Sequence, residues 1–122
     1  MTEDQFKPAD IKPLVEVEDL EKLDIRVGTI QSVEDMEGSN KLMKLLVDFG
    51  DHSRQILAGI KKERKVPKEL EGVQALFVVN LKPRRMMGQV SEGMLFDIGY
   101  PDGLLPVLAQ PERRVPNGSR AG

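Results

Sequence analysis

The chain contains 122 residues, of which 39% are hydrophobic and 31% are charged, and its formal net charge is −2. This length suits one domain with a single core and is too short for two. No apolar run is long enough to cross a bilayer, and the lack of cysteine excludes disulfides and thiolate metal sites. We therefore expect one cytoplasmic domain with no membrane partner.

Residues 1–13 contain two prolines and show no hydrophobic periodicity, so they are expected to form a flexible N-terminal tail. Residues 14–122 are then the folded domain. A short helix is predicted over residues 17–23, where Asp19 can act as a cap and leucines recur on one face.

The remaining chain alternates between short apolar runs and turn residues, which is typical of β-strands. Gly28 interrupts the first of these runs, and a bulge or a sharp coil is expected there. Pro67 is expected to begin a short helix that continues through Leu70 and stops at Gly72. The predicted strands cover residues 25–33, 42–49, 54–60, 73–80, 94–98 and 104–108.

This order of elements predicts an all-β fold with a short helix. Five strands with a helix between the third and the fourth form a five-stranded Greek-key OB-fold barrel. The chain would add N- and C-terminal extensions to that barrel.

The charge is unevenly distributed along the chain. Residues 1–51 hold 6 Lys or Arg and 13 Asp or Glu, whereas residues 52–90 hold 9 and 3, and residues 91–122 hold 3 and 4. A basic middle between acidic flanks predicts one positive face on an acidic body. Such a face can bind an anionic partner even though the whole protein is acidic.

The segment that follows the apolar run 73–79 is the strongest candidate for function. It carries Lys82, Arg84 and Arg85 around Pro83 and returns to an apolar run at Met94. It contains no acid–base pair, nucleophile or metal-ligand cluster, so it indicates binding and not catalysis. His52 lies beside Asp51 without a third group to orient the pair, and we interpret it as part of a turn. Neither an enzyme activity nor a cofactor is expected.

This segment resembles a tRNA-binding domain. That domain is shared by the C-terminal regions of methionyl-tRNA synthetases, by small free-standing structure-specific tRNA-binding proteins and by endothelial-monocyte-activating polypeptide II. The likeness extends from about Leu20 to about Gly118. It is carried by Asn80, Leu81, Pro83, Arg85, Met86, Gly88, Ser91, Gly93 and Met94, and upstream by residues 24–28, 38–42 and 58–60.

The resemblance implies an OB-fold and a non-catalytic domain that binds tRNA. The expected tRNA-binding residues are Lys41, Lys61, Asn80, Lys82, Arg84, Arg85, Ser91 and Met94. The cations would contact phosphates, Ser91 would bond to ribose or phosphate, and Met94 would pack on a base or sugar. Alternatives remain at several of these positions. Lys41 can be an ordinary surface lysine, the run 61–65 a solubilising loop, Ser91 a turn cap and Met94 the start of a core strand.

The resemblance also implies a homodimer. Its expected interface combines two apolar strips, made by Leu20, Leu23 and Ile25 and by Leu104, Leu105 and Val107. The alternative is that both strips pack against their own barrel.

Two questions of biological role stay open. The domain can be free-standing, as Met1 and the length suggest, or part of a tRNA synthetase, and association with a synthetase is a further expectation. The alternative function is that of an export-related chaperone of the same fold, which would bind unfolded preproteins. The run from Ser91 to Met94 favours the tRNA-binding branch.

Overall fold

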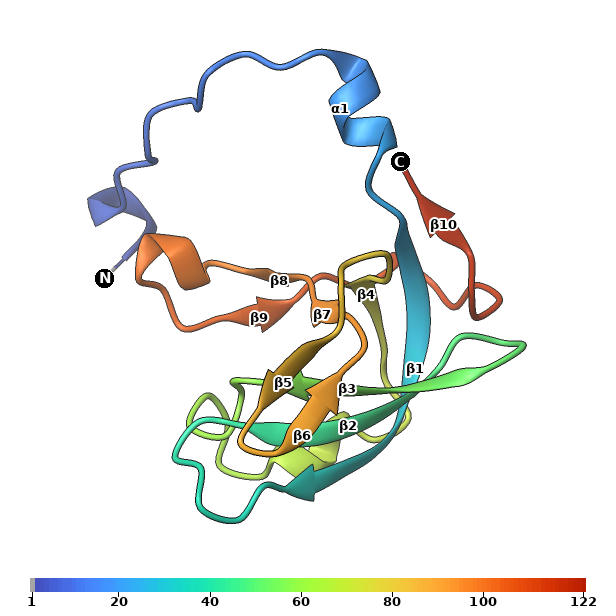
Figure 1. The fold of residues 1–122 in the computed structure, drawn as a ribbon. Helices are drawn as coiled ribbons and strands as arrows, with labels where there is room; N and C mark the ends of the chain where they lie inside the picture. The colour runs from blue at the N-terminus through green and yellow to red at the C-terminus, as the bar shows by residue number, and fades with distance from the viewer. Residues whose placement is uncertain (1) are drawn as a thin grey trace.

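The computed structural model describes residues 2–122, so that Met1, the first residue of the expected tail, lies outside the described residues. Figure 1 shows a curled antiparallel sheet with little helix. Its strand order is β3-β2-β1-β4-β7, and β10 pairs with the start of β1. These strands are β1 (Ile25–Asp35), β2 (Met43–Asp48), β3 (Ser53–Ala58), β4 (Gln74–Val78), β7 (Met94–Leu95) and β10 (Arg120–Ala121).

The predicted OB-like barrel is confirmed. A 3-10 helix, η2 (Pro67–Leu70), lies between β3 and β4, where the sequence predicts a short helix. Alternate residues of β2 are buried, as the two-residue side-chain period predicts for a strand with one face toward the core, whereas β4 is buried on both faces. The largest fully buried side chains are those of Ile30, Val33, Leu45, Val47, Ile56, Ile60 and Phe77.

The N-terminal segment arches away from the barrel in Figure 1 before it joins β1. It contains η1 (Glu3–Gln5) and α1 (Val17–Glu21), so the predicted helix ends two residues early. Asp19 lies inside this helix, where its Oδ2 accepts a hydrogen bond from the Glu16 backbone N–H at 3.3 Å. In the part of the chain described here, no helix is both long and apolar enough to cross a membrane.

The bulge predicted at Gly28 is wrong. The register of β1 against β2 shifts between Ile30 and Ser32, whereas Gly28 pairs regularly with Ala75 of β4. Gly28 is required by close packing, because a Cβ there would lie 2.6 Å from Val47 Cγ1 and 2.8 Å from Phe49 Cε1. Two side chains of the core fill the space that any larger residue would need.

The predicted strand over residues 94–98 is divided in two. Its first part, β7, pairs with β4, and its second part, β8 (Asp97–Ile98), pairs with β9 (Val107–Leu108). Phe96 lies between the two strands. Its N–H donates to Leu76 O in β4, whereas its carbonyl accepts from the N–H of Ala109, which follows β9. The strand predicted over 104–108 is thereby reduced to β9, and η3 (Tyr100–Asp102) occupies the predicted turn.

The C-terminal extension is attached to the barrel by the buried side chain of Gln74. Its Nε2 donates to Val115 O at 2.6 Å and to Asn117 Oδ1 at 2.9 Å, and its Oε1 accepts from the Val115 N–H at 3.1 Å. Thr29 Oγ1 also donates to Asn117 Oδ1, at 2.8 Å. Because Gln74 is buried, these bonds satisfy groups that would otherwise lack partners.

Candidate nucleic-acid interface

Two strands that the sequence does not predict form a hairpin over the candidate segment. β5 (Arg84–Met86) pairs with β6 (Gln89–Ser91) through a two-residue turn at Met87 and Gly88. Both turn residues have positive φ, 50° and 80°, as a type I′ turn requires. A glycine adopts this conformation easily and a methionine does not. The usual Asn-Gly or Asp-Gly signal is absent, which explains why the hairpin is missed.

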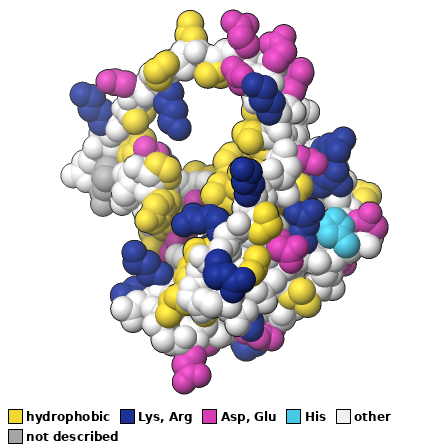
Figure 2. All heavy atoms as spheres, in the orientation of Figure 1, with side chains coloured by type: hydrophobic (Ala, Val, Ile, Leu, Met, Phe, Trp, Pro, Cys, Tyr) yellow, Lys and Arg dark blue, Asp and Glu magenta, His cyan; other side chains and the backbone are white. Residues whose placement is uncertain are grey.

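A groove of about 400 Å³ lies between this hairpin, the end of β3 and the start of β7. We call it the hairpin groove. Several Lys and Arg side chains are visible over this face in Figure 2, with hydrophobic and acidic side chains between them. The residues that line the groove are Lys41, Leu42, Leu57, Gly59, Glu63, Leu81, Lys82, Arg84, Met86, Ser91, Gly93, Met94, Leu95, Asp97 and Tyr100.

Four of the predicted binding residues meet in the hairpin groove with exposed side chains: Lys41, Lys82, Arg84 and Met94. Arg85 is exposed as well but is not among the lining residues. Successive residues of a strand point to opposite faces, so Arg85 projects from the other face of β5. Arg84 and Arg85 therefore lie on different surfaces of the protein.

Ser91 lines the groove but is buried, with 2% of its surface exposed. Its hydroxyl donates to Gly93 O at 2.9 Å and accepts from the Leu57 N–H at 3.0 Å. These bonds connect the end of β6 to β3, where Gln55 Nε2 also donates to Val90 O at 2.9 Å. This geometry favours the structural alternative for Ser91, because its hydroxyl already has both a donor and an acceptor partner.

The ammonium group of Lys61 already has partners within the protein. Its Nζ donates to Met36 O at 3.1 Å and to Ser39 O, and it forms an ion pair with Asp35. Its backbone N–H donates to Lys41 O at 2.9 Å. Lys61 thus holds the turn that presents Lys41, which indicates an indirect part in any binding.

The side-chain amide of Asn80 is also hydrogen-bonded within the protein. Its Oδ1 accepts from the Asp24 N–H at 2.8 Å and its Nδ2 donates to Lys22 O at 2.7 Å. This amide joins the end of β4 to the segment that leads into β1. The neighbouring Asp24 carboxylate accepts from Arg26 and Arg120, and the Arg26 bond is the main cause that lowers the pKa of Asp24.

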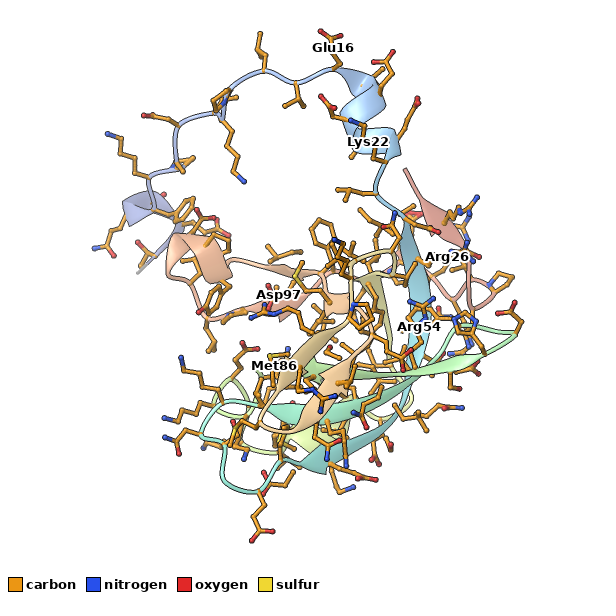
Figure 3. The ribbon with its side chains drawn as sticks, in the orientation of Figure 1. Glu16, Lys22, Arg26, Arg54, Met86 and Asp97 are labelled. Atoms are coloured by element: carbon orange, nitrogen blue, oxygen red, sulfur yellow. The ribbon has the colours of Figure 1, made fainter. Side chains whose placement is uncertain are left out.

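Two carboxylates in the hairpin groove were not predicted. Burial raises the pKa of Glu63, and the nearby Asp97 raises it further, while Arg64 opposes the shift. Burial also raises the pKa of Asp97, which is labelled in Figure 3. Glu63 lies within a run of lysines and arginines, so the sequence does not indicate that its carboxylate lies in the groove. Both carboxylates limit the positive charge of the groove. Among residues 2–122, no group of three or more possible ligands could hold a metal ion.

A second groove, of about 600 Å³, lies between α1, the start of β1 and β10. We call it the N-terminal groove. Leu20, Leu23 and Ile25 line it, as does Phe96. The other half of the predicted dimer interface does not line this groove. Leu105 and Val107 are exposed to 71% and 54% near β9, and Leu104 packs against Gly99. Within one chain, the two predicted strips remain separate surfaces.

Comparison with known proteins identifies one family over most of the chain. The family model described as "Putative tRNA binding domain" matches residues 25–120. Methionine–tRNA ligase of Archaeoglobus fulgidus is 42% identical over 109 residues, which make up 89% of this chain and 16% of that protein. The chain spans about a sixth of the length of the curated relatives it matches.

Solved structures of similar size share the fold. A methionyl-tRNA synthetase-related protein from Pyrococcus horikoshii superposes with a TM-score of 0.83 and 38% identity, covering 91% of this chain and all of that one. The chaperone CsaA from Bacillus anthracis superposes with a TM-score of 0.78 and 33% identity, covering 90% of this chain and all of that one. Proteins of this fold therefore include one described as synthetase-related and one described as a chaperone.

Proposed function

The chain belongs to the family of tRNA-binding domains, and from this premise we propose that it binds folded tRNA without catalysing a reaction. The observation that carries the proposal is the meeting of Lys41, Lys82 and Arg84 in one groove beside the exposed thioether of Met94. Arg85 would add a phosphate contact from the other face of β5. The apolar walls of the groove suit stacked bases or sugars, and its rim suits phosphates.

The proposed recognition is of tRNA shape. The deep groove of an A-form helix does not admit side chains, so a folded RNA is contacted through phosphates and 2′-hydroxyls. The hairpin and the turn before β2 present cations from two directions, which suits a curved backbone more than a single extended strand. Glu63 and Asp97 would disfavour indiscriminate binding to polyanions, since they place negative charge inside the same groove.

A titration at two salt concentrations tests this proposal. Folded tRNA is compared with an unstructured RNA of equal length, and fluorescence anisotropy reports binding. We expect tighter binding to folded tRNA and a loss of affinity at higher salt, because phosphate contacts release counterions. Equal and feeble binding to both RNAs would contradict it. Unfolded precursor proteins would then be the ligand to test, in line with the likeness to a chaperone.

The relatives suggest where such an activity is used. Proteins named methionine–tRNA ligase contain a segment similar to this chain. We infer that the domain serves translation in the cytoplasm, either by raising the affinity of a synthetase for tRNA or by carrying tRNA independently. In both cases the domain supplies binding, and a synthetase supplies the chemistry.

We also propose that the domain forms a homodimer through Leu20, Leu23 and Ile25, with Leu104, Leu105 and Val107 as the second strip. The support is the apolar lining of the N-terminal groove and the exposure of Leu105 and Val107. Contiguous exposed apolar surface is typical of association sites. A dimer would present two hairpin grooves related by a two-fold axis.

Sedimentation equilibrium tests the dimer. The chain has a mass of 13.6 kDa, so we expect twice this value for the wild type. Replacing Leu20 and Leu23 together by serine is expected to give the monomer, since it removes apolar area from the contact. Serine at Leu46 and Val66 is the matched control, because both are exposed apolar residues outside the proposed interface. A wild type that sediments at 13.6 kDa would contradict the proposal.

A further inference from the structure

We propose that Arg54 is a positioning residue for RNA binding, which holds both ends of residues 80–92 against the barrel without contacting RNA itself. This segment, which we call the basic segment, carries Lys82, Arg84 and Arg85. The proposal rests on the proposed function for its consequence. Its structural part, the control of the segment by one guanidinium, can be tested on the free protein.

The geometry of Arg54 carries the first step. The side chain extends from β3 and is labelled in Figure 3. Its Nη1 donates to Val79 O at 2.6 Å and to Glu92 O at 3.2 Å. These carbonyls flank the basic segment, one on the residue before it and one on its last residue. A single charged donor therefore ties together the points where the segment leaves and rejoins the barrel, and bonds from charged donors are strong.

The guanidinium is itself oriented by a second set of contacts. Its Nε donates to His52 Nε2 at 3.0 Å, while His52 Nδ1 lies 2.6 Å from Asp51 Oδ1. An Nε2 that accepts a hydrogen bond leaves the ring proton on Nδ1, where it is donated to Asp51. His52 also stacks on Phe49, with ring centroids 5.7 Å apart and planes at 28°. The buried Phe49 lies under Arg54 as well, with the guanidinium carbon 6.0 Å from its ring centroid.

The basic segment needs such a support because it is not held by a continuous backbone ladder. Its hairpin forms a separate two-stranded sheet and is not part of the main sheet. It meets β3 through the Glu92 N–H to Gln55 O bond and through the side chains of Gln55 and Ser91. Those contacts act near β6, whereas Arg54 also reaches the end of β4. Without it, the start of the segment would lose a direct connection to β3.

Amide hydrogen exchange of the free protein is the first measurement, comparing wild type with Arg54→Ala and Arg54→Met. We expect exchange over residues 84–92 to accelerate by about tenfold in Arg54→Ala, with β1 and β2 unchanged. Arg54→Met keeps an unbranched side chain of similar length over Phe49 but has no N–H donor for Val79 O and Glu92 O, so we expect faster exchange of the same residues. Arg113→Ala is the matched control, because Arg113 is exposed and pairs with its neighbour Glu112.

Binding of folded tRNA by the same four proteins is the second measurement. We expect about tenfold weaker binding for Arg54→Ala, a loss of affinity for Arg54→Met as well, and no change for Arg113→Ala. Unchanged exchange over residues 84–92 in Arg54→Met would overturn the proposal, even if Arg54→Ala fails to fold. Faster exchange with wild-type tRNA affinity would show that the basic segment does not bind tRNA. Failure of the wild type to bind tRNA would reject the proposed function, while exchange would still decide the role of Arg54 in the segment.

Discussion

Replacing Lys82, Arg84 and Arg85 together by alanine is expected to weaken the binding of folded tRNA by about a hundredfold. All three side chains are exposed, so their loss should leave the melting temperature nearly unchanged. The slope of log affinity against log salt should fall by about one for each phosphate contact removed. Anisotropy titrations at several salt concentrations, together with a thermal melt, measure both effects.

The matched control removes the same charge elsewhere. Alanine at Lys12, Lys68 and Arg113 also lowers the net charge by three, and these side chains are exposed and lie outside the hairpin groove. If binding depends on the local arrangement of cations, this control retains nearly all of its affinity. Equal losses in the two triple variants would show that binding follows net charge alone, and the hairpin groove would no longer be the candidate site. Single variants would then separate Arg84, inside the groove, from Arg85 on the other face.

Gly28→Ala is expected to destabilise the fold by about 1–3 kcal/mol. The new Cβ would lie 2.6 Å from Val47 Cγ1 and 2.8 Å from Phe49 Cε1, closer than side chains tolerate. Val47 and Phe49 are buried, so neither can move without disturbing the core. A fall of several degrees in the melting temperature, and a lower midpoint in urea, would record the loss.

Gly59→Ala provides the control for this substitution. Gly59 follows β3, its φ lies outside the left-handed region, and a Cβ there would meet nothing within 4 Å. We expect its stability to equal that of the wild type or to exceed it slightly, since alanine restricts the unfolded chain. Equal stability of Gly28→Ala and the wild type would mean that the core can adjust to the extra methyl group. In that case close packing would not be the reason for glycine in β1.

The fold follows from local properties of the chain. Short apolar runs separated by turn residues predict β1, β2, β3, β4 and β7 of the main sheet but not β10, and Pro67 begins the short helix between β3 and β4 as expected. These signals depend on neighbours a few residues apart, which a single sequence contains in full. Errors arise where the local signal is weak. Met87 and Gly88 make a hairpin turn without its usual residues, and Phe96 changes strand partners inside one apolar run.

The candidate site can be predicted only in part from local properties of the sequence. Composition is enough to identify the basic segment and its contrast with the acidic flanks. The use of each side chain depends on partners far away in the sequence, as for Asn80 with Lys22, Lys61 with Met36 and Ser91 with Leu57. No periodicity in the sequence predicts such pairings, because they form only when the folded chain brings distant segments together, as it brings β3 against the hairpin for Ser91 and Leu57.

The sequence by itself therefore determines the class of fold, the resemblance to tRNA-binding domains and the cations available for binding. Only the tertiary structure decides which of those cations share a groove, since strand alternation and closure of the sheet separate Arg84 from Arg85. It also assigns Arg54 its contacts with Val79 and Glu92, 25 and 38 residues away. The physical reason is that the residue type fixes the chemical group of each side chain, whereas the direction and burial of that side chain are fixed only when the chain packs.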